Sequence, residues 1–214
     1  PSSVRSHLSA DLAYETRQLR FIENHDEPRA AVALGPGRSA AAAVLIATLP
    51  GATLIHEGQL TGQRVKLPVQ LGRRPDEPAD AACEAFYRRI LGDAAHPIYH
   101  HGAFSMRSVD PAWSGNGSHE GLIACTWRLG NERRLVVVNV SGGPAPGRIA
   151  LSDFDVAGQS FWLDDLLDGA RYDREGDEMV GPGLYVQLAA FQSHVLRFSA
   201  RYPARAPASP PRAP

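Results

Sequence analysis

The chain has 214 residues, of which 43% are hydrophobic and 21% charged, a composition typical of a globular protein with one large or two modest domains. Its 22 Lys and Arg residues nearly balance 23 Asp and Glu residues, so no basic field exists for a phosphate backbone and nucleic acid is not expected as a partner. The longest apolar run, residues 40–49, is about half of what a transmembrane helix needs, and no leader-like segment precedes it. We therefore expect neither a membrane span nor a signal peptide.

The two cysteines, Cys83 and Cys125, are too few for the disulfide framework of a secreted domain. They are expected to be buried thiols in a reducing compartment, which indicates a cytoplasmic protein. The chain starts at Pro1 rather than at a methionine, so we expect its N-terminal edge to reflect processing, cleavage or an incomplete gene.

Two short apolar runs in the first third predict strands. Residues 19–24 form the first run, which delivers His25 and Asp26 at its end before Pro28 blocks its continuation. Residues 52–55 form the second run, which also ends in a polar group. A helix-forming stretch lies between them, and strand, helix and strand in this order predict a parallel pair with a right-handed crossover.

Two helices are predicted in the same part of the chain. Ser39 is the expected N-cap of the first helix, residues 40–49, which ends at a Pro-Gly pair. The second helix, residues 79–91, has apolar side chains at helical spacing and is expected to stop at Gly92.

From residue 98 onward the pattern changes to short alternating runs separated by Gly, Asn, Asp and Pro, which predicts an antiparallel β-sandwich. The expected strands are residues 122–127, 134–140, 148–151, 160–163, 184–188 and 194–198. The end of the chain is rich in Pro, Ala and Arg, so residues 201–214 are expected to be a disordered tail. The predicted division is residues 1–93 for the α/β part and 96–200 for the sandwich.

Three matches, made by five segments in all, link the chain to the α-amylase family of glycoside hydrolases, which it resembles. The segment Phe-Ile-Glu-Asn-His-Asp-Glu-Pro-Arg at residues 21–29 looks like the family's Asn-His-Asp signature at the end of the seventh strand of its (β/α)8 barrel. The segment Gly-Ala-Thr-Leu-Ile-His-Glu-Gly-Gln at residues 51–59 is similar to the eighth strand and its glycine-glutamine loop. Residues 86–91 resemble the last barrel helix, and segments 135–141 and 163–169 resemble the C-terminal sandwich.

The resemblance implies a fold and an activity. The fold would be the last two β/α units of a (β/α)8 TIM barrel followed by an antiparallel β-sandwich. The activity would be that of a retaining α-glycosidase or α-glucanotransferase that acts on α-glucosidic bonds of an α-glucan or maltooligosaccharide. No cofactor and no metal ligand are implied for this chain.

The resemblance also assigns residue roles. Asp26 matches the third active-site carboxylate, which orients the sugar at the cleavage subsite, and His25 matches a histidine that binds hydroxyls of the same sugar. Asn24, Arg29 and Glu57 are further candidates for substrate binding. The nucleophile and the general acid of the family belong to earlier barrel strands that this chain lacks. The isolated chain is therefore expected to be inactive, with the missing N-terminal part of the barrel as its partner.

Other readings stay open at this point. The chain has His56-Glu57 before its Gly-Gln pair and Leu60 after it, where many family members have aromatics before and a glutamate after, so the choice of substrate is open. His25, Asp26, His56 and Glu57 could instead form a metal site. The sandwich could be a non-catalytic carbohydrate-binding or scaffold module, or the chain could be a subunit that completes a split barrel.

Among the three tryptophans, the sequence places Trp127 and Trp162 in the core and leaves Trp113 as the loop candidate for sugar stacking.

Overall fold

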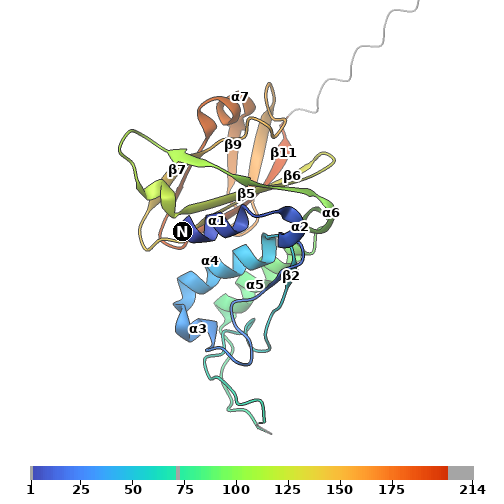
Figure 1. The fold of residues 1–214 in the computed structure, drawn as a ribbon, viewed down its shortest axis with the longest axis vertical. Helices are drawn as coiled ribbons and strands as arrows, with labels where there is room; N and C mark the ends of the chain where they lie inside the picture. Colours follow the sequence, from blue (N-terminus) through green and yellow to red (C-terminus); the bar gives the residue numbers. More distant parts are fainter. Residues whose placement is uncertain (1, 71–72, 202–214) are drawn as a thin grey trace, which may run out of the picture.

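The structure is a computed structural model that describes residues 2–70 and 73–201. It is built in three layers (Figure 1), with helices α4 (Gly35–Thr48) and α5 (Ala81–Ala94) on one side of a large antiparallel sheet and a smaller sheet on the other side. All of the expected disordered tail except Arg201 lies outside the described residues. In the part of the chain that is described, no helix is both long enough and apolar enough to cross a bilayer.

The two predicted strands of the α/β part form a parallel pair, as expected. Strand β1 (Leu19–Arg20) lies beside β2 (Ala52–Thr53) in the register Leu19 to Ala52 and Arg20 to Thr53. Both strands are shorter than the apolar runs that predict them. Within the described residues neither strand has a second neighbour, so the ladder ends after two pairs and the following residues continue as extended chain.

The helices differ from the prediction at their ends. Two short helices, α1 (Ser2–Leu8) and α2 (Leu12–Glu15), precede β1, and α3 (Ala30–Ala33) precedes α4. Ser39 does not cap α4, because the helix already begins at Gly35 and the Ser39 hydroxyl donates to the Ala30 carbonyl at 2.9 Å.

Helix α5 does not stop at Gly92, since a glycine in an exposed last turn weakens a helix without ending it. It begins at Ala81, and Asp80 is its N-cap, whose carboxylate accepts from backbone N–H groups of the first turn.

The predicted sandwich is confirmed, with more strands than the sequence indicated. The large sheet has the order β3-β5-β6-β11-β8-β9 and the small sheet the order β10-β7-β4, both antiparallel. The large sheet consists of β3 (Ala103–Arg107), β5 (Leu122–Leu129), β6 (Glu132–Asn139), β11 (Ser193–Ala200), β8 (Ser160–Asp165) and β9 (Arg171–Glu175). The small sheet consists of β10 (Leu184–Leu188), β7 (Ala145–Ile149) and β4 (Val109–Pro111). Short helices α6 (Ile98–His101), η1 (Ser118–Gly121), α7 (Gly176–Glu178) and η2 (Met179–Gly183) connect them.

The central strands of the large sheet are buried on both faces. On one face Leu135 and Val137 of β6 join the core between the two sheets. On the opposite face Val136 and Val138 pack against α1, α4 and α5, with Val44 of α4 at the centre of that second core. Because both faces of this strand are covered, apolar side chains are needed at successive positions, which explains the uninterrupted Leu-Val-Val-Val segment. The helices of the α/β part thus share a core with the sandwich.

Candidate functional site

His25 and Asp26 lie on an exposed turn that follows β1. The turn is held by Asn24, whose Oδ1 accepts from the backbone N–H of Asp26 at 2.8 Å and of Glu27 at 2.9 Å. The two side chains face solvent, His25 with 63% and Asp26 with 76% of its side chain exposed, and their Nε2 and Oδ2 atoms are 3.2 Å apart. Lys66 donates to the backbone carbonyl of Asp26. The turn therefore presents an imidazole and a carboxylate side by side.

Arg29 lies beneath this turn and joins three segments. It is buried, and its Nη1 lies 2.7 Å from Nδ1 of His56. Its Nη2 donates to the carbonyl of Glu57 at 2.9 Å and its Nε to the carbonyl of Gln63 at 3.3 Å. A planar guanidinium with donors in a fixed fork suits such a junction. Arg29 thereby connects the segment after β1 to the segment after β2.

Glu23 is a functional candidate that the sequence analysis missed. Its side chain is 1% exposed, and its Oε2 accepts from the backbone N–H of Ala30 at 2.5 Å. Its Oε1 lies 3.2 Å from Nη1 of Arg29 and 3.5 Å from Nδ1 of His56. The signal in the sequence is a carboxylate inside an apolar strand run, since a buried charge requires a partner. Glu23, Arg29 and His56 form what we call the buried charge cluster.

Glu57 and His56, although adjacent, have different surroundings. His56 is half-buried in the charge cluster, whereas Glu57 is exposed and forms an ion pair with Arg74. Among the residues that the structure describes, no group of three or more His, Cys, Asp or Glu side chains is arranged to hold a metal ion. The structure thus brings His25 and Asp26 together at one turn and gives His56 and Glu57 other partners.

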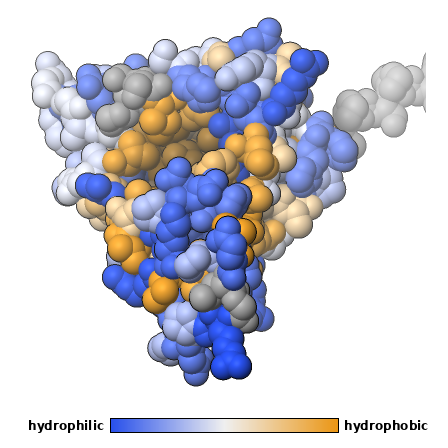
Figure 2. Space-filling view, turned by 60° about the horizontal axis from the view of Figure 1, so that its bottom comes forward, coloured by the Kyte–Doolittle hydropathy of each residue, from blue (hydrophilic) through white to orange (hydrophobic). Residues whose placement is uncertain are grey.

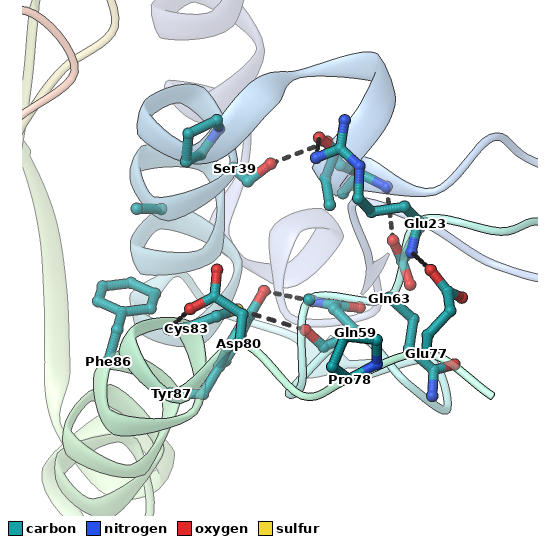
Figure 3. Close-up of a pocket in the computed structure, with 16 residues that line it drawn as sticks. Glu23, Ser39, Gln59, Gln63, Glu77, Pro78, Asp80, Cys83, Phe86 and Tyr87 are labelled. Atoms are coloured by element: carbon teal, nitrogen blue, oxygen red, sulfur yellow. Dashed lines mark hydrogen bonds between the residues drawn. The ribbon is translucent and has the colours of Figure 1, made fainter.

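A cavity of about 300 Å³ opens beside the charge cluster (Figure 3). Phe86, Tyr87 and Cys83 of α5 form one wall, and Glu23 lies on the opposite side. Gln59 donates to the Tyr87 hydroxyl at 2.8 Å, and burial raises the pKa of Tyr87 to about 12. Burial also raises the pKa of the Cys83 thiol, with Asp80 adding to the shift, so this thiol is a poor nucleophile. His25 and Asp26 do not line the cavity.

The three tryptophans lie in three different environments. Trp127 is buried, as predicted, and its indole N–H donates to the Thr48 carbonyl at 2.7 Å. Trp162 is not a core residue, because it lies on the outer face of β8 with the guanidinium carbons of Arg171 and Arg201 at 5.7 and 5.2 Å from its ring centroid. Trp113 is 58% exposed.

The fold is that of the C-terminal part of α-amylase chains. The structure of an α-amylase from Geobacillus thermoleovorans in complex with acarbose matches with a TM-score of 0.67 at 16% identity, covering 94% of this chain and 43% of the other. The α-amylase of Lactobacillus plantarum matches with a TM-score of 0.63 at 17% identity, covering 92% of this chain and 41% of the other. The predicted fold, the end of a barrel followed by an antiparallel sandwich, is thus confirmed.

The sequence comparison agrees with the fold. The chain is 34% identical over 130 residues to the α-amylase MalA of Haloarcula japonica, and the match covers 59% of this chain and 18% of MalA. No model of a known protein family matches the chain. The chain therefore spans about a fifth of this relative and about two fifths of the solved structures that it matches. The resemblance to the α-amylase family is confirmed by sequence and fold together.

Proposed function

We propose that this chain forms the C-terminal end of a retaining α-glycosidase or α-glucanotransferase that acts on α-glucosidic bonds of α-glucans or maltooligosaccharides. The observation that carries the proposal is the paired display of His25 and Asp26 on the turn after β1, in the segment that resembles the Asn-His-Asp signature. The likeness to MalA and to the acarbose-bound Geobacillus enzyme supports this substrate class.

In this proposal Asp26 orients the sugar at the cleavage subsite and His25 donates a hydrogen bond to one of its hydroxyls. Such a bond lowers the barrier when it strengthens as the sugar gains oxocarbenium character. Retaining hydrolysis also needs a nucleophile and a general acid about 5 to 5.5 Å apart. We assign both to barrel strands outside this sequence, so the isolated chain is expected to be inactive.

The remaining candidates divide into two roles. Glu57 is exposed, so it remains a candidate for substrate binding. Asn24 holds the turn through its side-chain oxygen, and Arg29 acts from below through the buried charge cluster. We therefore propose Asn24, Arg29 and Glu23 as positioning residues, which hold the His25–Asp26 turn at a fixed distance from the segment after β2.

The partner in this proposal is the N-terminal part of the barrel. Large apolar side chains that are exposed within the described residues concentrate before residue 70. They are Val4, Leu12, Tyr14, Leu19, Phe21, Val32, Leu60, Val65 and Val69, with Trp113 as the exception. A space-filling view shows apolar surface gathered in a hollow between polar rims (Figure 2). Leu19 and Phe21 share one side of an extended segment, and within the described residues its strand edge has no second partner; in a complete barrel a neighbouring strand would pair with that edge, and the layers packed on the sheet would cover the two side chains.

We further propose the division into a barrel end, residues 1–93, and a sandwich domain, residues 96–200. The shared core means that the two parts would fold as one unit. Both cysteines are free thiols, which supports the proposed cytoplasmic location.

The experiment compares the 214-residue chain with a longer protein in which the preceding barrel strands are present. Each is incubated with maltoheptaose, and the anomeric configuration of the first product is followed by proton NMR. We expect α-configured product from the longer protein and none from the chain alone. Turnover by the chain alone, or a β-configured first product, contradicts the proposal. A chain that regains activity only when mixed with a separately expressed N-terminal part would be a subunit that completes a split barrel.

A further inference from the structure

The cavity of about 300 Å³ beside the buried charge cluster has no role in the function proposed above, because neither His25 nor Asp26 lines it. It lies between the N-terminal halves of α4 and α5 and the segment that follows β2 (Figure 3). Its volume is at the lower end of the range for sites that hold small organic molecules. The chemistry of its walls therefore decides which kind of molecule fits.

Part of the lining is apolar and held in a fixed shape. It includes small or cyclic residues of α4 and two aromatic residues of α5, namely Pro36, Ala40, Phe86 and Tyr87. The two aromatic rings meet edge to face, with their centroids 5.3 Å apart. Gly62 of the segment after β2 has a φ of +69°, and a Cβ there would lie 3.2 Å from Cβ of Asp80, so this segment packs closely against the start of α5. The walls therefore keep their shape without a ligand.

Two carboxylates of the lining have no cationic partner among the described residues. Both oxygens of Glu77 accept from backbone N–H groups, those of Arg64 and Val65 at 2.9 and 3.1 Å. One oxygen of Asp80 accepts from two backbone N–H groups in the first turn of α5, at 2.9 and 3.1 Å. Backbone donors are neutral, so they stabilise each carboxylate without cancelling its charge. Arg64 is the only cationic residue in the described lining, and its Nη1 donates to the Ala31 carbonyl at 3.4 Å instead.

A third carboxylate of the lining, that of Glu23, adds to the negative charge. It is buried, and its Oε1 accepts no hydrogen bond from the described residues, although Nη1 of Arg29 lies 3.2 Å away. The carboxylates act on both polar groups that α5 presents. Burial raises the pKa of the Cys83 thiol, and Asp80 and Glu23 raise it further. Burial also raises the pKa of Tyr87, and Glu23 adds to that shift. Three carboxylates thus outnumber the two guanidinium groups at the cavity, which gives it a negative potential.

We propose that this cavity is a binding site for a small organic ammonium ion. The apolar part of such a ligand packs against Ala40 and Phe86, and its ammonium group lies near Glu77 and Asp80, where an aromatic ring adds to the attraction. An anionic ligand would meet charges of its own sign, and a bare metal ion would leave the aromatic wall without a contact. The described residues also offer no group of three metal-binding side chains. The inference rests on the cavity alone and does not depend on the proposed glycosidase function.

The test titrates the 214-residue chain with benzylammonium chloride and follows backbone amide resonances by NMR. We expect saturable shifts at residues 59–64 and 80–87, and about tenfold weaker binding or more for Glu77→Gln and for Asp80→Asn, because each removes one charge from the cavity. Asparagine keeps the acceptor that caps α5, so Asp80→Asn preserves the helix. Glu84→Gln is the matched control, because Glu84 lies on the same helix outside the lining and pairs with Arg88. Benzyl alcohol, a neutral probe of the same shape, should also bind about tenfold more weakly or worse.

A further variant, Ala40→Leu, fills the cavity without changing its charge and should abolish the binding, while unchanged dispersion of the remaining resonances verifies the fold. Benzylammonium binding that is unaffected by Ala40→Leu, or benzyl alcohol binding of equal affinity, overturns the inference. Absence of saturable shifts at residues 59–64 and 80–87 overturns it as well. Shifts that centre on the His25–Asp26 turn and disappear in Asp26→Asn also overturn it, because the cation then binds the exposed carboxylate of that turn. None of these results bears on the proposed function, which the experiment with maltoheptaose tests separately.

Discussion

Nη1 of Arg29 lies 2.7 Å from Nδ1 of His56, so the segments that follow the two parallel strands are joined side chain to side chain. A guanidinium can only donate, so Nδ1 of His56 accepts and its Nε2 carries the hydrogen. The same guanidinium lies 3.2 Å from the buried carboxylate of Glu23. The position of the His25–Asp26 turn relative to the segment after β2 therefore depends on this cluster.

Replacement of Arg29 by methionine should destabilise the chain by about 3–5 kcal/mol, because it leaves the Glu23 charge buried without its partner. Chemical unfolding monitored by circular dichroism measures this loss. Arg17→Met, at an exposed position, is the matched control and should change the free energy of unfolding by no more than about 0.5 kcal/mol. The double variant Arg29→Met, Glu23→Gln should recover part of the loss, and a double variant as unstable as the sum of the two single ones would contradict a paired cluster.

Substitution of Trp127 tests the shared core, because its indole N–H connects the sandwich to the Thr48 carbonyl of α4. Trp127→Phe removes the only indole N–H at this position and leaves the buried Thr48 carbonyl without that donor, so we expect a loss of about 2 kcal/mol. Trp113→Phe, at an exposed site, should stay within about 0.5 kcal/mol of the parent. Equal effects of the two substitutions in urea unfolding would mean that α4 does not depend on the sandwich.

Low pH should reduce the free energy of unfolding, in part because it protonates the Asp164 carboxylate of the sandwich. Burial by itself would raise the pKa of this carboxyl, but hydrogen bonds from Arg171, Arg197 and Ser199 outweigh burial and hold the pKa below its usual range. A carboxyl with a lowered pKa in the folded state stabilises the protein above its unfolded pKa of about 3.9, and this contribution is lost as the pH falls through the folded pKa. Asp164→Asn should therefore reduce the drop in unfolding free energy below about pH 4. An unchanged acid profile of this variant would rule out the contribution of Asp164.

High pH should destabilise the protein, because it ionises buried tyrosine and cysteine side chains that are neutral in the folded state. Burial raises the pKa of Tyr87 to about 12 from 10.0 and that of Cys125 to about 12 from 9.0. A group whose pKa is raised on folding stabilises the protein below its unfolded pKa, and this stability is lost as the pH rises through the folded value. The free energy of unfolding should therefore fall between about pH 9 and 12, and the slope should be shallower in Tyr87→Phe. Identical slopes for the parent and Tyr87→Phe would show that Tyr87 ionises equally in both states.

Much of the fold could be predicted because it depends on local patterns. The alternation of apolar residues at 184–188 matches β10 residue for residue, and the order of strand, helix and strand gave the parallel pair. Strand β9 was missed because Arg-Tyr-Asp-Arg-Glu has no apolar face, and its pairing is set by β8 rather than by its own residues. The end of α5 was misplaced at Gly92 because one glycine weakens a helix less than packing of the preceding turns stabilises it.

The site was predictable only in part. The segment that resembles a known signature located His25 and Asp26, and the structure places both on one exposed turn. The buried charge cluster depends on contacts between residues 23, 29 and 56, which no local pattern reveals.

The most direct test of the account uses the protein in which the preceding barrel strands are present and measures kcat for maltoheptaose in the Asp26→Asn variant. If Asp26 orients the sugar in the transition state, kcat should fall by about a hundredfold or more. Glu27→Gln removes the neighbouring carboxylate of the same turn and should leave kcat unchanged. A turnover by Asp26→Asn that equals that of Glu27→Gln would contradict the role assigned to the turn after β1.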